Sequence, residues 1–145
     1  MTHSYENLLA VLEKEFSLCT RLLELLQQER EVVASLDPEA LELLLREKEV
    51  VTSGIKVCDE ARERVLGELG FKDLTICEVS ERAEAAYREP LASLASRFTA
   101  LIHSITEQNT LNSMLIEKSL YYIKTSYNFL NTFEVSAPQK VSVEA

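Results

Sequence analysis

The sequence predicts an all-α fold: an elongated helical hairpin, a short helix and a long C-terminal helix, assembled as a coiled-coil-like antiparallel bundle. The 145 residues include only 3 Gly and 3 Pro, too few for the frequent turns of a β-sandwich or barrel. Hydrophobic residues make up 46% of the chain, which is enough to form a buried core. Apolar residues recur at intervals of three and four, as in amphipathic helices.

The first helix is predicted over residues 4–35, with Ser4 as its N-cap. Its apolar positions form one continuous face: Tyr5, Leu8, Leu9, Leu12, Phe16, Cys19, Leu22, Leu23 and Leu26. Asp37 can cap a second helix over residues 38–69, with Pro38 at its first position, where no amide hydrogen is needed. So short a connection predicts an antiparallel helix pair.

Turn and capping residues organise the middle of the chain. Gly54, inside the second helix, predicts a close approach or a mild bend. Gly70 is a good C-terminal stop for that helix. Thr75 and Glu78 have the spacing of a capping box, which predicts a short helix over residues 76–87.

A last helix is predicted over residues 90–133, and Pro90 either begins it or kinks a longer continuous helix. Positions spaced strictly by four and three form a coiled-coil-like seam along it: Phe98, Ile102, Ile105, Asn109, Asn112, Ile116, Ser119, Ile123, Ser126 and Leu130. This seam should extend along the whole first hairpin. We expect residues 1–133 to form a single helical domain and residues 134–145 a flexible C-terminal tail.

The net charge of −9 disfavours nucleic acids and anionic membranes as partners, because both repel an acidic surface. Residues 1–90 carry this charge, with 11 Lys and Arg against 20 Asp and Glu, whereas residues 91–145 hold four of each. A neutral, apolar C-terminal third suits either a protein-contact surface or the more buried helix of a bundle. We expect neither a signal peptide nor membrane insertion, because no apolar run approaches a membrane span.

Residues that could support catalysis or bind metal are sparse. Cys19, Cys58 and Cys77 are widely separated, which predicts reduced, buried thiols in a cytoplasmic protein rather than a disulfide framework. His3 and His103 have no acid, serine or cysteine at a catalytic spacing. Neither follows a Glu by three positions, as the Glu-x-x-His pairs of a di-iron bundle require. We therefore expect no enzymatic activity, no cofactor and no metal site.

Polar and aromatic residues of the last helix leave two hypotheses open. Asn109 and Asn112 could be a polar pair that fixes the register of the bundle, or a patch that recognises a partner. Tyr122, Phe129 and Phe133 lie outside the strict seam. They could anchor an interface, or pack against the far end of the hairpin.

Two segments together carry a family resemblance. In the first, residues 22–51, the matching features are Gln28-Glu29-Arg30, the turn at Asp37 and Glu47-Lys48-Glu49. In the second, residues 108–130, the matching feature is Asn109-x-x-Asn112-x-x-Leu115-Ile116. In order and spacing they resemble the first hairpin and the last helix of the FlgN family of flagellar type III export chaperones, over about residues 8–130.

The resemblance implies a cytoplasmic chaperone for hook-associated flagellar proteins, the FlgK- and FlgL-like hook–filament junction proteins. Such a chaperone prevents premature assembly and delivers its substrates to the export apparatus. The resemblance places partner binding on the last helix, at Asn109, Asn112, Leu115, Ile116, Ser119, Ile123, Tyr127 and Leu130. Many members have a Tyr-Gly segment after this helix, and here it is missing. A contact with the export gate is therefore left open, with Tyr127 or Phe133 as substitutes.

The alternative hypothesis is a structural coiled-coil or oligomerisation adaptor. In that case the seam of residues 98–130 would serve self-association, and the protein would ignore export substrates.

Overall fold

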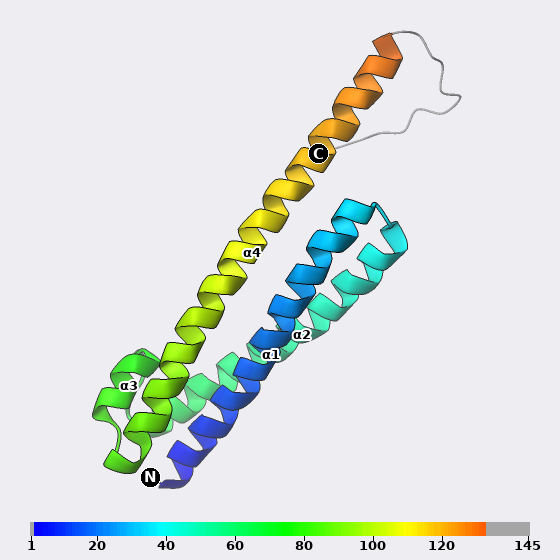
Figure 1. The fold of residues 1–145 in the computed structure, drawn as a ribbon. Coiled ribbons are helices and arrows are strands. Elements are labelled where there is room, and N and C mark those ends of the chain that lie inside the picture. The colour runs from blue at the N-terminus through cyan, green and yellow to red at the C-terminus, as the bar shows by residue number, and fades with distance from the viewer. Residues whose placement is uncertain (1, 133–145) are drawn as a thin grey trace.

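The computed structural model describes residues 2–132, apart from the side chain of Phe129. Its elements are α1 (Thr2–Ser35), α2 (Pro38–Glu68), α3 (Ile76–Arg82) and α4 (Ala85–Thr132), and the described residues contain no strand. This confirms the all-α prediction. Figure 1 shows α1 and α2 as a long hairpin, α3 at its open end, and α4 running alongside α1 past the hairpin turn. The predicted tail lies outside the described residues.

Two buried hydrogen-bonded pairs between α1 and α2 align the hairpin. Arg62 donates a hydrogen bond to Glu15, and Lys48 donates one to Glu29 at 2.8 Å. Both carboxylates are almost completely buried. The two acids are two heptads apart on α1, and the two bases are two heptads apart on α2, so all four lie on the heptad-spaced inner faces. By this register, apolar and thiol residues also oppose each other: Leu12 and Val65, Cys19 and Cys58, Leu22 and Ile55, Leu26 and Val51.

The turn between α1 and α2 forms as predicted. The Asp37 carboxylate accepts hydrogen bonds from the amides of Glu39 and Ala40, at 3.1 and 3.2 Å, and so caps α2. Pro38 occupies the first turn of the helix. Leu36 has a φ of 57°, so the chain reverses through a left-handed residue whose side chain is well exposed.

Both predicted glycine roles in α2 are confirmed. Gly70 has a φ of 77°, and the Phe71 amide donates to the Leu66 carbonyl at 2.8 Å, which closes the helix in a Schellman-type turn. A Cβ at Gly54 would lie 3.1 Å from a methyl group of Leu18. The absence of a side chain there allows α1 and α2 to approach closely.

The capping box of α3 is present, but the predicted helix over residues 76–87 is too long. Thr75 and Glu78 exchange the two expected hydrogen bonds. The helix then ends at Ala83, whose backbone is extended and whose side chain is buried. The hydroxyl of Tyr5 accepts a hydrogen bond from the following amide, of Glu84, at 3.4 Å. The extended backbone at Ala83 thus ends α3 after seven residues, and Tyr5 of α1 contacts the chain just beyond that end.

Two predicted helix starts are also corrected. The last helix begins at Ala85 rather than Pro90, and Pro90 lies inside it, in the second turn. Pro90 is the sixth residue of the helix, so it lies past the four amides that have no partner within it and leaves the Ala86 carbonyl without its usual i→i−4 hydrogen bond. The first helix begins at Thr2 rather than at Ser4.

The main core lies at the open end of the hairpin, where α1, α2, α3 and α4 meet. Its buried residues are Tyr5, Leu8, Leu12, Val65, Leu66, Leu69, Val79, Ala83, Leu91 and Leu94. A smaller cluster, Leu25, Leu44 and Val51, lies nearer the turn. The apolar core thus thins towards the hairpin turn, where α4 continues.

Candidate functional site

The long helix α4 runs parallel to α1, as Figure 1 shows. The rings of Phe16 and Phe98 meet edge to face with centroids 5.3 Å apart, and Glu29 contacts Asn112 at 3.0 Å. In these pairs the residue number on α4 exceeds that of its α1 partner by 82 or 83, which gives the register of the two parallel helices. Ser119 and Leu120 still lie beside Val32 and Val33 near the end of α1 at Ser35, so the segment of α4 that projects beyond the hairpin is residues 121–132. At 1.5 Å per residue, this projecting segment is about 20 Å long.

The face of α4 that meets the hairpin differs from the predicted seam. Its buried and half-buried residues include Leu91, Leu94, Phe98, Leu101, Ile105, Gln108, Asn112, Leu115 and Ser119. The prediction was therefore right at Phe98, Ile105, Asn112 and Ser119, and wrong at Ile102 and Asn109. Ile102 and Asn109 are exposed. Apolar residues occupy both 101 and 102, and both 115 and 116, so two heptad phases fitted the sequence.

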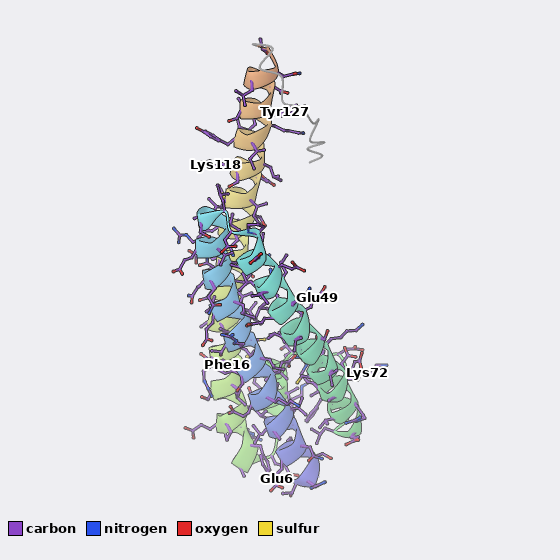
Figure 2. The ribbon with its side chains drawn as sticks, turned by 90° about the vertical axis from the view of Figure 1, so that its right-hand side faces the viewer. Glu6, Phe16, Glu49, Lys72, Lys118 and Tyr127 are labelled. Carbon is purple, nitrogen blue, oxygen red and sulfur yellow. The ribbon has the colours of Figure 1, made fainter. Side chains whose placement is uncertain are left out.

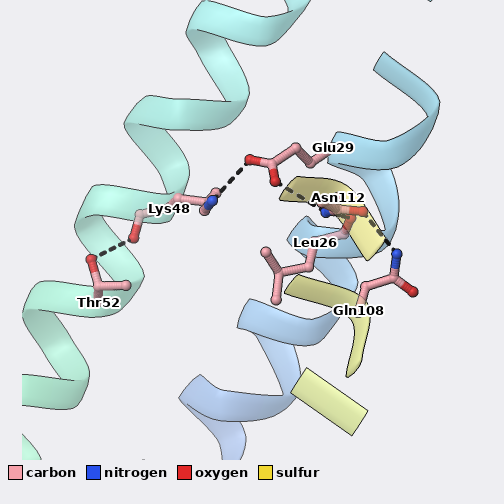
Figure 3. A network of polar contacts seen from close by, with 6 residues as sticks. All are labelled: Leu26, Glu29, Lys48, Thr52, Gln108 and Asn112. Carbon is pink, nitrogen blue, oxygen red and sulfur yellow. Dashed lines mark hydrogen bonds and ion pairs between the residues drawn. The ribbon is translucent and has the colours of Figure 1, made fainter. Parts of the chain in front are cut away.

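Asn112 is the centre of a buried polar network (Figure 3). Its side chain is 1% exposed, and its amide donates to the Leu26 carbonyl at 2.7 Å and to a carboxylate oxygen of Glu29 at 3.0 Å. Its own side-chain oxygen accepts a hydrogen bond from Gln108 at 2.9 Å. The other carboxylate oxygen of Glu29 accepts from Lys48 on α2. One network therefore joins α1, α2 and α4.

This arrangement favours the register-fixing hypothesis for Asn112. A buried amide is stable only where its donors and acceptor have partners, and Leu26 and Glu29 supply them at one position along α1. Asn109 is exposed and has no part in the network. The two asparagines are thus not a pair.

An apolar groove of about 460 Å³ lies where α4 passes the hairpin turn. Its walls come from α1, the turn, the start of α2, and α4. They consist of Val32, Val33, Leu36, Asp37, Pro38, Leu41, Ile116, Ser119, Leu120 and Ile123. Almost all of these side chains are apolar, so the groove could accept apolar side chains but offers few hydrogen-bond partners.

Beyond the groove, the inner face of α4 continues into the projecting segment. Ile123 and Leu130 are 44% and 51% exposed, and Tyr127 lies between them on the same face. Figure 2 shows Tyr127 on this part of α4, beyond the hairpin. The heptad pattern of apolar residues on α4 thus continues beyond the end of the hairpin.

The structure brings together only some of the predicted partner-binding residues. Ile116, Ser119 and Ile123 line the groove, and Ile116 is 38% exposed. Tyr127 and Leu130 continue the same face. The remaining three residues are placed differently: Asn109 is exposed, Leu115 is half-buried, and Asn112 is buried in the network. Their role in partner binding stays a prediction.

Sequence reasoning missed the groove residues contributed by the hairpin. Val32, Leu36 and Leu41 flank the predicted turn, and Leu120 follows Ser119 on α4. The available signal was Leu36, a large apolar residue in a tight turn, where polar residues are usual. It also missed Gln108, which lies one helical turn before Asn112 and satisfies its oxygen.

The second buried acid, Glu15, has unusual electrostatics. Burial, reinforced by the nearby Asp59 carboxyl, raises the pKa of Glu15 to about 7 despite the opposing charge of Arg62. Burial also raises the pKa of Cys19 to about 11. Cys19 and Cys58 are buried free thiols as predicted, whereas Cys77 is exposed, because it lies on the outer side of α3.

Residues 2–132 bear on two further functional classes, metal binding and membrane insertion. Within this part of the chain, no cluster of three or more His, Cys, Asp or Glu side chains is arranged to hold a metal ion. None of the described helices is both long and apolar enough to span a bilayer.

Comparison with known proteins gives one match. The family model described as FlgN protein matches residues 1–136, which is nearly the whole chain. No curated protein and no solved structure matches the sequence.

Proposed function

The chain belongs to the FlgN family of flagellar export chaperones, and from this premise we propose that it binds hook-associated, FlgK- or FlgL-like junction proteins. In this proposal it masks a helix of the substrate in the bacterial cytoplasm. The masked substrate cannot assemble prematurely and is delivered to the type III export apparatus. Binding is stoichiometric and involves no turnover, in keeping with a family of chaperones rather than enzymes.

The observation that carries the proposal is the uncovered inner face of α4. An amphipathic helix binds a partner by laying its apolar face into a groove, with anchors three, four and seven residues apart. Ile116, Ile123, Tyr127 and Leu130 have this spacing, and the groove at the hairpin turn begins beside Ile116. A substrate helix seated there would contact both α4 and the hairpin.

The structure also refines the predicted site. In the described conformation Asn112 offers almost no surface to a partner, so we assign it to holding α4 against α1. Asn109 is exposed on the flank of the helix. We therefore place the main substrate contacts on Ile116, Ser119 and Ile123, and on Tyr127 and Leu130 beyond them. Tyr127 is also our candidate for the export-gate contact.

The test is co-purification of the chaperone with a co-expressed hook–filament junction protein. We expect Ile116→Asp and Ile123→Asp to reduce the recovered complex at least about tenfold, because each places a carboxylate in a desolvated apolar contact. Ile102→Asp is the matched control. Ile102 is 53% exposed on the same helix, but it lies outside the groove and the projecting segment.

Circular dichroism would verify that all three variants fold. If Ile116→Asp and Ile123→Asp retain the complex as well as Ile102→Asp does, the site assignment is wrong. If the wild-type chain captures neither a FlgK-like nor a FlgL-like junction protein, the proposed substrate class is wrong. Asn112→Arg would be a poor test of the substrate-binding site. A buried arginine would disrupt the network of Glu29 and Lys48 whether or not Asn112 contacts a substrate.

A further inference from the structure

The apolar groove at the hairpin turn contains one charged side chain. Its lining is apolar apart from Asp37 at the turn and Ser119 on α4. Leu36 at the rim is 71% exposed, and Ile123 on the α4 wall is 44% exposed. Contiguous exposed apolar surface of this kind marks an interaction site. A partner that fills the groove must therefore supply apolar side chains and one group that suits a carboxylate.

The Asp37 carboxylate has an oxygen available for such a group. Both hydrogen bonds that cap α2 end on Oδ1, so Oδ2 takes no part in the cap. The side chain is exposed, and within residues 2–132 no Lys, Arg or His lies within ion-pair distance of it. A cation from a partner could therefore bind Asp37 at the wall of the groove, where solvent screens the ion pair less than on an open surface.

The rest of the hairpin turn carries the same sign of charge. Residues 31–42 contain four acids and no Lys or Arg, whereas the facing stretch of α4, residues 116–124, contains one acid and two lysines. Of the four acids, only Glu42 has an ion-pair partner in the described part of the chain, Arg46 at 2.8 Å. The hairpin wall of the groove therefore attracts cations, and the α4 wall does not. Such a difference selects and orients a partner by charge.

The uncovered face of α4 sets the length of the partner segment. It extends from Ile116, at the groove, to Leu130, which is 51% exposed. At 1.5 Å per residue, this distance is about 21 Å, or four helical turns. A partner helix of about 15 residues would cover it. Its apolar anchors must recur every three and four residues to lie along the groove.

We propose that the groove binds an amphipathic helix of about 15 residues whose apolar face is bordered by Lys or Arg on the side that meets the hairpin turn, with one basic side chain on Asp37. This proposal rests on the proposed function, and it names the chemistry of the substrate segment. A helix with the same apolar face but an acidic border is rejected, because its carboxylates would meet the acids of the turn. Apolar contact supplies most of the affinity, and charge supplies the selection.

Two synthetic peptides of about 15 residues test the selection. They share Leu at every third and fourth position and differ only at the flanking positions, which are Lys in one and Glu in the other. Fluorescence anisotropy with the purified full chain should give a Kd at least about tenfold lower for the lysine peptide at low salt. The difference should shrink several-fold at about 0.5 M salt. Ile123→Ser should weaken both peptides, because both place apolar anchors beside Ile123.

Asp37→Asn locates the charge effect, which the net charge of −9 would otherwise spread over the whole chain. Asparagine caps a helix as well as aspartate does, so the turn should keep its structure, and circular dichroism would verify this. We expect this variant to bind the lysine peptide about two- to fivefold more weakly, and the glutamate peptide no more weakly than wild type. Glu60→Gln is the matched control. It removes the same charge from an exposed position on α2, about 33 Å from Pro38 along the helix.

Equal affinity for the two peptides would overturn the proposal, and so would equal losses in Asp37→Asn and Glu60→Gln. Binding of both peptides that Ile123→Ser leaves unchanged would show that they bind outside the groove, which also overturns it. Neither peptide is a junction protein. A chain that captures a junction protein but does not prefer the lysine peptide keeps the proposed function and loses this inference. A chain that selects the lysine peptide through Asp37 but captures no junction protein keeps the groove chemistry and loses the proposed substrate class.

Discussion

The two parts of α4 differ in what they contact, although they share one sequence pattern. Residues 85–120 lie beside the hairpin and bury Leu91, Leu94 and Asn112, whereas residues 121–132 project beyond the hairpin turn with Ile123 and Leu130 exposed. In both parts apolar residues recur every three and four positions. Periodicity therefore shows which face of a helix is made for contact. The length of the hairpin decides whether that contact lies within the chain.

The largest expected difference between the two parts is in the cost of removing a leucine. Leu91 is fully buried in the main core, and Leu130 is half exposed. We expect Leu91→Ala to lower the free energy of unfolding by about 2–5 kcal/mol, the usual cost of an unfilled core position. Leu130→Ala should change it by less than about 0.5 kcal/mol.

Urea unfolding followed by circular dichroism measures both values. It should be done on the purified full chain without an export substrate. A cost above about 1 kcal/mol for Leu130→Ala under these conditions would mean that the projecting segment packs within the single chain. The distinction between the two parts of α4 would then be wrong.

Local sequence signals predicted the ends of the hairpin helices well. Asp37, Pro38, Gly70 and the capping box at Thr75 act through neighbouring backbone groups only, so their effect is visible in the sequence. The end of α3 at Ala83 was not predictable in this way. Ala83 is buried in the same core cluster as Tyr5, which is distant in the sequence.

The candidate site was only partly predictable, for a similar reason. The sequence identified the helix, and five of the predicted residues lie on the exposed face or in the groove. It did not fix the heptad phase, because both Leu101 and Ile102 are apolar and only the position of α1 selects between them. Nor did it show that Asn112 would find Leu26 and Glu29 as partners. Such pairings join residues that are far apart in the sequence, so they are set by how α4 packs on α1.

A second prediction concerns pH and the hairpin that covers the first part of α4, because Glu15 lies on α1 and contacts Arg62 on α2. The pKa of Glu15 is raised to about 7 in the folded state, mainly by burial, from an ordinary value of 4.5. Between these values the folded chain keeps a proton that the unfolded chain has lost. The free energy of unfolding should therefore fall as the pH rises from about 4.5 to 7, by up to about 3 kcal/mol, and then level off.

Glu15→Gln stays neutral and should flatten this pH dependence. Urea unfolding at several pH values between 4.5 and 8 measures the difference from wild type. Glu31→Gln is a suitable control, because Glu31 is an exposed acid on the same helix. If wild type and Glu15→Gln lose stability in parallel over this range, Glu15 does not hold its proton in the folded state.

The smallest of the three effects is expected at Asn112, which lies close to the boundary between the two parts of α4. Asn112→Ala removes the two hydrogen bonds to α1 and leaves the Leu26 carbonyl and Glu29 with fewer partners. We expect a loss of about 1–3 kcal/mol. Asn109→Ala is the control and should change little, since Asn109 is exposed.

Hydrogen exchange would show where the Asn112→Ala loss occurs. We expect faster exchange in α4 from about Gln108 onward and little change near Leu91 and Leu94, which are held by the main core. In this variant α4 would then separate from α1 from about Gln108 onward, so a longer part of the helix would project. Uniformly faster exchange throughout α4 would contradict this prediction. It would mean that Asn112 supports the whole packing of α4 on α1, rather than marking the point beyond which the helix is free for a partner.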